Sequence, residues 1–286
     1  MDLGEIGIWS GRLRGAAPAA AVDAAKRIEA LGFGTAWLSS GAPGQLEQVR
    51  ALVGGTSTLT VATGILNVYT EADPAKTAAT FHEIDVANPG RVLLGIGIGH
   101  AQSLPAGAYG PPLPTIGRYL DQLDAAPNPV PVERRALAAL RPRMLRLSKE
   151  RSLGAHPYLT SPAHTREARE ILGADSLLAP EQGVVLETDP TRARAVARLH
   201  LGRYLTLTNY VNSFRHLGFG DADFEHDGSD RLVDEIIAWG DLEAIAARVR
   251  AHLAAGATHV ALQVLTETPD EFPVAAWERL AGELLR

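Results

Sequence analysis

The chain has 286 residues, with 27 basic and 33 acidic side chains, a formal net charge of −6 and no cysteine. This composition excludes a disordered or collagen-like chain, a disulfide scaffold, a cysteine nucleophile and a cysteine-ligated metal site. Because the charge is negative and no long basic run occurs, we expect no nucleic acid partner. The sequence has no signal-peptide pattern and no apolar run of about 18 residues, so we expect a cytoplasmic protein without a membrane partner.

Short apolar or β-branched runs alternate along the chain with longer segments of helical period. In chain order we predict a strand at 3–9, a helix at 17–31, a strand at 35–38, a helix at 45–53, a strand at 58–66, a helix at 75–87, a strand at 92–98, a helix at 116–123, a strand at 135–140, a helix at 142–151, a strand at 155–159, a helix at 163–172, strands at 177–186 and 259–265 separated by a helix at 242–255, and a closing helix at 274–285. The prolines at 111–114 and 127–131 are read as a chain break and a surface linker.

Eight strands that alternate with helices over this length predict one (β/α)8 TIM barrel domain spanning residues 1–286. A doubly wound parallel sheet is the alternative. Residues 190–239 lie between the seventh and eighth strands and predict a helical insertion at the barrel mouth. In such barrels the active site lies at the carboxyl ends of the strands, so the residues that follow each strand are the candidates for function.

The richest strand end is LLGIGIGHA, which carries Gly95, Gly97, Gly99 and His100. Alternate glycines clear one face of a strand and let a flat ligand, or simply a neighbouring strand, approach closely. The spacing does not fit a dinucleotide-binding fingerprint. His100 is a candidate for proton transfer, because an imidazole titrates near neutral pH.

Other strand ends allow a functional and a structural interpretation. In VATGILN, Gly64 predicts either a bulge that faces a ligand or tight packing. In LAALRPRML, Pro142 suits a first helical turn, so Arg141 and Arg143 either build an anion site there or pair with surface acids such as Glu133 and Glu150.

Two further strand ends carry polar side chains. The run 156–158, which is His-Pro-Tyr, either lines a pocket or forms a turn, and Glu181 is either ion-paired or catalytic. No zinc-protease helix, nucleophile elbow or phosphate-binding loop occurs, so we expect no metal site.

Four segments in this order carry a resemblance to a known family: TAWL, VATGILNVY, NPGRVLLGIGIGHA and LAALRPRMLRLSKERSLGAHPYLTSPAHTREARE. The chain resembles the bacterial luciferase-like superfamily, and within it an actinobacterial branch of coenzyme F420-dependent oxidoreductases. The resemblance covers nearly the whole chain. It implies a TIM barrel that binds the deazaflavin F420 and transfers a hydride between its ring and an unidentified small organic substrate.

The resemblance also assigns roles to positions. Gly64 and Ile65 match a bulge, often with a cis peptide bond, that backs the cofactor ring, and His100 matches the place of a catalytic polar group. The full set of implied cofactor contacts is Ser40, Gly64, Ile65, Asn67, Gly97, Gly99, Ala101, Ala139, Leu140, Arg141 and Pro142, the last four around the phosphate-bearing tail. Trp9, Tyr158 and Gln182 are the expected substrate contacts, and we expect a homodimer.

The chain departs from relatives at two of these positions. Ser40-Gly41 stands where sugar-phosphate dehydrogenases of the superfamily carry an acid followed by a catalytic histidine, and Arg141 stands where relatives have a small residue. The segment 111–131 is also short. Two alternatives therefore stay open: an FMN-dependent luciferase-like monooxygenase, and a non-catalytic flavin-binding barrel.

Overall fold

The computed structural model describes residues 1–39 and 44–285, and its strands form one parallel sheet. The central strands are β1 (Ile6–Ser10), β2 (Thr35–Ser39), β3 (Thr60–Gly64), β4 (Leu66–Asn67), β5 (Val92–Gly97), β6 (Arg135–Leu137), β7 (Gly154–Ala155), β8 (Leu177–Leu178), β9 (Glu181–Val185) and β11 (Val260–Val264). Neighbours pair in the order β9, β11, β1, β2, β3, β5, β6, β7, β8, and β4 pairs with β5.

The barrel is closed by one continuous segment of the chain, which runs from β8 into β9. β8 pairs with β7 and β9 pairs with β11, and only Ala179 and Pro180 separate β8 from β9. The amide of Ala179 donates to Ala155 and the carbonyl of Pro180 accepts from Ala261, so both ladders continue through this junction. The prediction of a (β/α)8 TIM barrel is confirmed.

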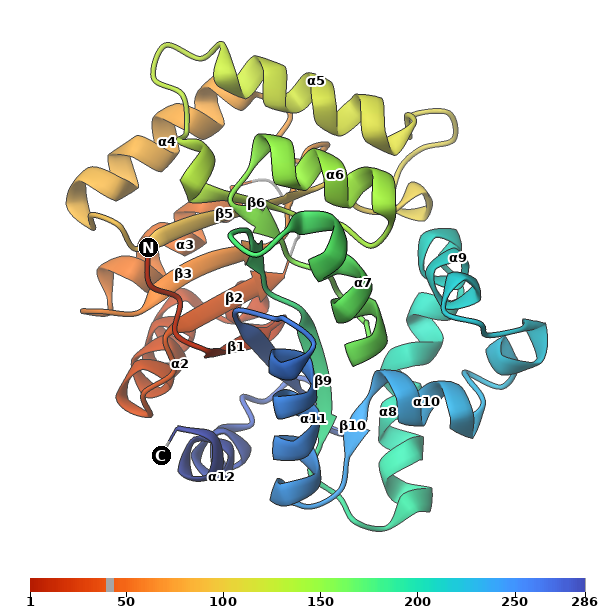
Figure 1. Ribbon diagram of the computed structural model, residues 1–286. Helices are drawn as coiled ribbons and strands as arrows, with labels where there is room; N and C mark the ends of the chain where they lie inside the picture. The colour runs from red at the N-terminus through yellow and green to blue at the C-terminus, as the bar shows by residue number, and fades with distance from the viewer. Residues whose placement is uncertain (40–43, 286) are drawn as a thin grey trace.

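Helices surround the barrel and cover its strands (Figure 1). They are α1 (Arg12–Gly15), α2 (Pro18–Ala30), α3 (Gln45–Gly54), α4 (Pro74–Ala87), α5 (Pro112–Asp124), α6 (Pro142–Arg151), α7 (Pro162–Leu172), α11 (Leu242–Ala254) and α12 (Val274–Leu284). Several begin with proline, which is tolerated in the first turn because the amide there has no helical partner. For this reason α5 begins at Pro112, although the sequence prediction placed a chain break there.

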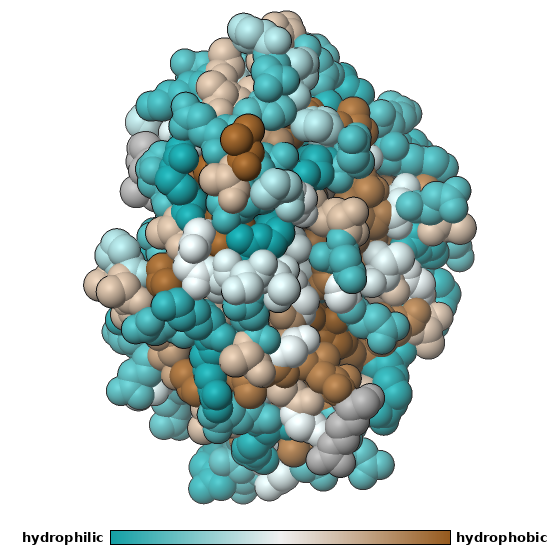
Figure 2. All heavy atoms as spheres, turned by 90° about the vertical axis from the view of Figure 1, so that its left-hand side faces the viewer, coloured by the Kyte–Doolittle hydropathy of each residue, from teal (hydrophilic) through white to brown (hydrophobic). Residues whose placement is uncertain are grey.

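Side chains on the outer faces of these helices are mostly polar. Figure 2 shows one face of the molecule, where hydrophilic residues predominate and hydrophobic residues form smaller separate patches. Within the described ranges, no helix combines the length and the apolar character needed to cross a membrane.

The segment 190–239 folds beside the barrel as three helices and a short strand. These are α8 (Pro190–Leu205), α9 (Thr208–His216), α10 (Asp230–Ile236) and β10 (Ala238–Trp239), which pairs with β9. They have a hydrophobic core of their own, which includes Val196, Leu201, Phe214, Leu232 and Ile236, and which also packs against three barrel residues, Leu159, Val185 and Leu265. The segment is therefore a compact helical part of the chain that packs against the barrel.

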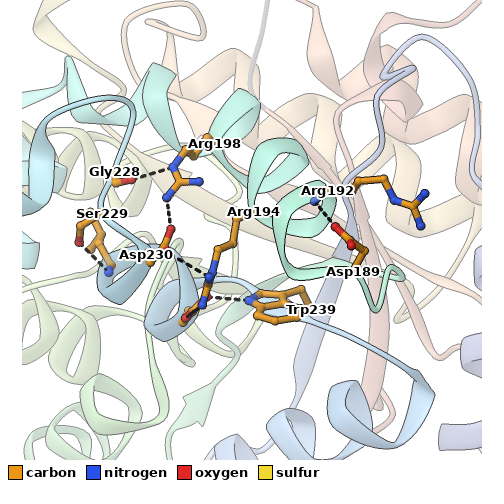
Figure 3. A network of polar contacts seen from close by, with 10 residues as sticks. Asp189, Arg192, Arg194, Arg198, Gly228, Ser229, Asp230 and Trp239 are labelled. Atoms are coloured by element: carbon orange, nitrogen blue, oxygen red, sulfur yellow. Dashed lines mark hydrogen bonds and ion pairs between the residues drawn. The ribbon is translucent and has the colours of Figure 1, made fainter.

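A polar network fixes α8 against α10 and β10 (Figure 3). Arg194 forms a two-pronged ion pair with Asp234, at 2.9 and 2.6 Å, and its third nitrogen lies 2.9 Å from Asp230. Arg198 bonds Asp230 and the carbonyl of Gly228. The indole of Trp239 donates to Asp234 at 2.7 Å. Bidentate arginine–carboxylate pairs restrict orientation as well as distance, so this network sets the tilt of α8.

Candidate functional site

A cavity of about 1000 Å³ opens at the carboxyl ends of the barrel strands. Its walls come from two sources, the strand ends and helices α8 and α9. The lining includes Trp9, Gly64, Ile65, Gly99, His100, Ala139, Leu140, Arg141, His156, Tyr158, His200, Arg203, Tyr204, Asn209, Tyr210 and Gln263. Pockets of this size and position are the usual ligand sites of TIM barrels.

One wall of the cavity follows the end of β3. The Gly64–Ile65 peptide bond is cis, as predicted. A Cβ atom at Gly97 would lie 2.5 Å from Cδ1 of Ile65, so a larger residue there would displace the Ile65 side chain. Gly99 has φ +68°, in the left-handed region that favours glycine. The wall beside the cavity is therefore built mainly from backbone, which suits a flat ligand.

Of the cofactor contacts expected away from the phosphate-bearing tail, Asn67, Gly97 and Ala101 do not line the cavity. The Asn67 side chain accepts from the amide of Tyr69 at 3.0 Å and shapes the turn after β4. Gly97 lies behind Ile65, and Ala101 begins a short 3-10 turn that leads away from the site. Their positions support the wall without reaching the ligand space.

His100 lines the cavity close to α9. Its ring lies 5.7 Å from that of Tyr210, and its Nδ1 is buried without a hydrogen-bond partner among the described residues. Burial lowers the pKa of His100, and a hydrogen bond with Asn209 opposes that shift. The imidazole is therefore largely neutral near pH 7 and able to exchange a proton with a ligand.

Tyr158, an expected substrate contact, is the centre of a hydrogen-bonded cluster. Its hydroxyl donates to Gln263 at 2.7 Å, accepts from Tyr204 at 3.0 Å and lies 3.1 Å from Nε2 of His200. Burial raises the pKa of Tyr158 well above its ordinary value and lowers that of His200 to about 4. These three contacts hold the Tyr158 hydroxyl in one position in the cavity wall.

The start of α6 places positive charge at the cavity. Ala139, Leu140 and Arg141 line the cavity, whereas Pro142 and Arg143 line a smaller adjacent hollow. Neither arginine forms an ion pair with any described acid, so the alternative of pairing with Glu133 or Glu150 is not found. The helix begins at Pro142, and its free amide groups add to the attraction for an anion.

Two neighbouring residues of β9 point in opposite directions. Gln182 is fully buried, donates to the carbonyl of Ile236 at 3.0 Å and lies 2.9 Å from Nε2 of His252 in α11. It therefore packs outside the barrel and does not line the cavity, so the expectation of a substrate contact is wrong. Glu181 points inward, is fully buried and accepts from the amide of Leu159 at 3.1 Å. Desolvation raises the pKa of Glu181 to about 8.

Three expectations remain, at Ser40, at Trp9 and at the run 156–158. Ser40 lies outside the described residues. Trp9 lines the cavity as expected, and His156 does so as well. Four further residues of the cavity are not predicted by the sequence, because nothing in their spacing indicates which face of the insertion meets the barrel: His200, Tyr204, Asn209 and Tyr210. In the described ranges, no three His, Cys, Asp or Glu side chains lie close enough together to hold a metal ion.

Comparisons with known proteins agree with this architecture. Residues 4–110 match the family model described as luciferase-like monooxygenase. A comparison with curated proteins finds no match.

Three solved structures illustrate the range of similar folds. An F420-dependent secondary alcohol dehydrogenase in complex with an F420-acetone adduct has a TM-score of 0.74 and 15% identity, with 98% of this chain and 97% of that chain covered. The coenzyme F420-dependent tetrahydromethanopterin reductase from Methanopyrus kandleri has a TM-score of 0.70 and 18% identity, with 99% of each chain covered. The oxygenating constituent of 3,6-diketocamphane monooxygenase from Pseudomonas putida, in complex with FMN, has a TM-score of 0.69 and 15% identity, with 97% and 95% covered. At these identities the similarity establishes the fold.

Proposed function

We propose that this protein is an oxidoreductase that transfers a hydride between the deazaflavin coenzyme F420 and a small organic substrate. The observation that carries the proposal is a single cavity that has a backbone wall at Gly64–Ile65 and an arginine, Arg141, at the start of α6. F420-dependent enzymes among the similar structures support the choice of cofactor class.

The residues of the cavity fit such a cofactor. A flat tricyclic ring would lie against the wall formed by Gly64, Ile65 and Gly99. A side chain at Gly64 would reach Trp9 and His156 in the cavity, whereas one at Gly99 would reach Asn67. The phosphate-bearing tail would lie at Arg141 and the amide groups of α6. Bound there, the cofactor supplies the hydride chemistry, and the protein supplies orientation, charge and exclusion of water.

His100 is the proposed catalytic residue. It lines the same cavity, and burial keeps it largely neutral near pH 7, so its imidazole is able to give or accept a hydrogen bond at a reacting oxygen or nitrogen.

An FMN-dependent monooxygenase is the second candidate. It is favoured by the family match over residues 4–110 and by the FMN complex among the similar structures. Both cofactors carry phosphate, so the cation at Arg141 does not separate them.

Equilibrium titration followed by cofactor fluorescence separates the two candidates. We expect F420 to bind at least tenfold more tightly than FMN, with reduced and oxidised forms of each tested. Tighter binding of FMN would replace the first proposal with the second. If neither cofactor binds, both proposals are wrong and a non-catalytic barrel takes their place.

A further inference from the structure

Two polar atoms at the floor of the cavity lack hydrogen-bond partners in the described part of the chain. They are Nε1 of Trp9 and Nε2 of His156. Trp9 is 6% exposed and His156 is 1% exposed, and both side chains line the cavity. A buried polar atom without a partner costs free energy of about 1–3 kcal/mol, so such atoms point to a ligand.

The two nitrogens lie close together beside Gly64. A Cβ atom built on Gly64 would lie 2.6 Å from Nε1 of Trp9 and 3.1 Å from Nε2 of His156, so the two nitrogens are no more than 5.7 Å apart. One oxygen atom of a ligand in the cavity, at about 2.9 Å from each nitrogen, can bridge a gap of that size.

The surroundings of His156 fix which of its nitrogens carries the proton. Its Nδ1 lies 2.7 Å from the carbonyl oxygen of Ala179, which can only accept. In a regular parallel pairing of β7 with β8, that carbonyl would accept from the amide of residue 157, since Ala179 donates to Ala155 and Glu181 donates to Pro157. Residue 157 is proline and has no amide proton, so the imidazole takes its place.

The neutral ring therefore presents a bare Nε2 to the cavity. Burial lowers the pKa of His156 to about 4, which keeps this form dominant near pH 7. Nε2 of His156 is thus an acceptor, whereas Nε1 of Trp9 is always a donor.

We propose that Trp9 and His156 form a subsite for the hydroxyl group of an alcohol. A hydroxyl oxygen accepts one hydrogen bond and donates another, so a single oxygen satisfies the indole N–H and the imidazole nitrogen together. A ketone or an ether satisfies only Trp9, and an ammonium group only His156. The inference rests on the proposed function in one respect: it names hydroxylated molecules as the substrate class of that redox site.

The role of His156 in this subsite is to orient the hydroxyl. An imidazole whose pKa lies near 4 is a poor base at neutral pH, so the hydroxyl keeps its proton while bound. The neighbouring hydroxyl of Tyr158 is not available to the ligand, because Gln263, Tyr204 and His200 already occupy it.

The first test uses the full-length protein labelled with ¹⁵N-tryptophan and no cofactor. The chain has four tryptophans, and the indoles of Trp37 and Trp239 already donate to His259 and Asp234. On titration with cyclohexanol we expect the indole signal of Trp9 to shift, while those of Trp37 and Trp239 stay in place. A Trp9 signal that does not move at saturating cyclohexanol overturns the proposal.

The second test compares cyclohexanol with cyclohexanone, its ketone counterpart. We expect the alcohol to bind about tenfold more tightly, as one additional hydrogen bond implies. Trp9→Phe should weaken both ligands. His156→Phe, which keeps an aromatic ring against Trp37, should weaken only the alcohol and abolish the preference. Val86→Ala changes an exposed residue of α4 outside the cavity and serves as the control, with affinities unchanged.

Three outcomes decide the matter. Preservation of the alcohol preference in folded His156→Phe, checked by circular dichroism, overturns the subsite. A shift of the Trp9 signal with F420 or FMN alone, as large as with the alcohol, assigns the two nitrogens to the cofactor ring and also overturns it. If the alcohol response appears as expected but neither cofactor binds, the subsite stands and the proposed redox function fails.

Discussion

The indole of Trp37 lies flat against the imidazole of His156, with ring centroids 4.0 Å apart and an interplanar angle of 12°. Trp37 in turn donates from Nε1 to Nε2 of His259 at 3.0 Å. The floor of the cavity is thus a stack of buried rings whose donors and acceptors are assigned by the backbone carbonyls of Ala179 and Gly4. Its side chains have little freedom to reorient when a ligand binds.

Pro157→Ala should release the imidazole of His156. The new amide of residue 157 is placed to donate to the carbonyl of Ala179, in competition with Nδ1 of His156. In protein labelled with ¹⁵N-histidine, we expect the ring signals of His156 to change from those of a single tautomer to those of a mixture of tautomers. A spectrum identical to that of the wild type would show that the proline does not determine the tautomer.

His100→Ala should reduce turnover by about 100-fold once a substrate is identified, which is the lower end of the usual contribution of general acid–base catalysis. Cofactor affinity should change much less than turnover. Asn209→Ala provides a graded comparison: it removes the hydrogen bond that raises the pKa of His100, so the acidic limb of the pH–rate profile should move to lower pH. Wild-type turnover in His100→Ala would exclude the catalytic role.

Arg141→Ala should weaken F420 by about 1.5–3 kcal/mol, the range for a hydrogen bond to a charged group. The loss should be much smaller for a truncated deazaflavin without the phosphate tail. Arg143→Ala is the matched control, because Arg143 lines only the adjacent hollow. Equal losses for both ligands, or no loss for either, would remove Arg141 from the phosphate site.

Acid should destabilise the fold between pH 6.5 and pH 4. The pKa values of His156 and His259 are lowered to about 4, and that of His252 to about 3, mainly by desolvation. In this window the unfolded chain binds protons that the folded protein does not, so the free energy of unfolding falls with falling pH, by about 3 kcal/mol for each such histidine. His259→Gln should flatten the slope by one proton in urea unfolding at pH 7, 6 and 5. An unchanged slope would contradict the assignment.

Glu181 should have the opposite effect on the alkaline side. Its pKa is raised to about 8 in the folded protein, above the value of 4.5 for the unfolded chain, so the folded state holds a proton that the unfolded state has lost. Glu181 therefore contributes a fall in the free energy of unfolding up to about pH 8, which is visible above pH 6.5, where the buried histidines no longer oppose it. Glu181→Gln should lack this decline when urea midpoints at pH 7 and pH 8 are compared. If the variant keeps the wild-type slope, Glu181 is ionised in the folded protein.

Much of the barrel follows from the sequence because glycine and proline mark the ends of its elements. Helix α6 has the predicted bounds of 142–151, and α3 and α4 differ by one residue at one end. The sixth predicted strand, at 155–159, shortens to Gly154–Ala155, since Pro157 lacks an amide for the ladder and Leu159 has φ +53°. Pro157 is visible in the sequence, but its effect on the ladder can be predicted only when the neighbouring strand and its register are known.

The residues of the candidate site were harder to predict from the sequence than the elements of the barrel. A strand buried on both faces shows no alternation of polar and apolar residues, so the direction of Gln182 relative to Glu181 could not be assigned. The aromatic side chains of α8 and α9 reach the cavity only through tertiary packing. By contrast, Gly64 lies near the end of a predicted strand, His100 and Arg141 come shortly after one, and all three line the cavity.

The separate hydrophobic core and ion-pair network of residues 190–239 have an evolutionary consequence. Tyr204, Asn209 and Tyr210 face the ligand space from helices that are held together by their own contacts. Changes at these positions can alter which molecules fit without loosening the barrel or the wall at Gly64–Ile65. Selection for a new substrate would therefore be expected to act first on this segment, and laboratory libraries intended to change specificity should be concentrated there.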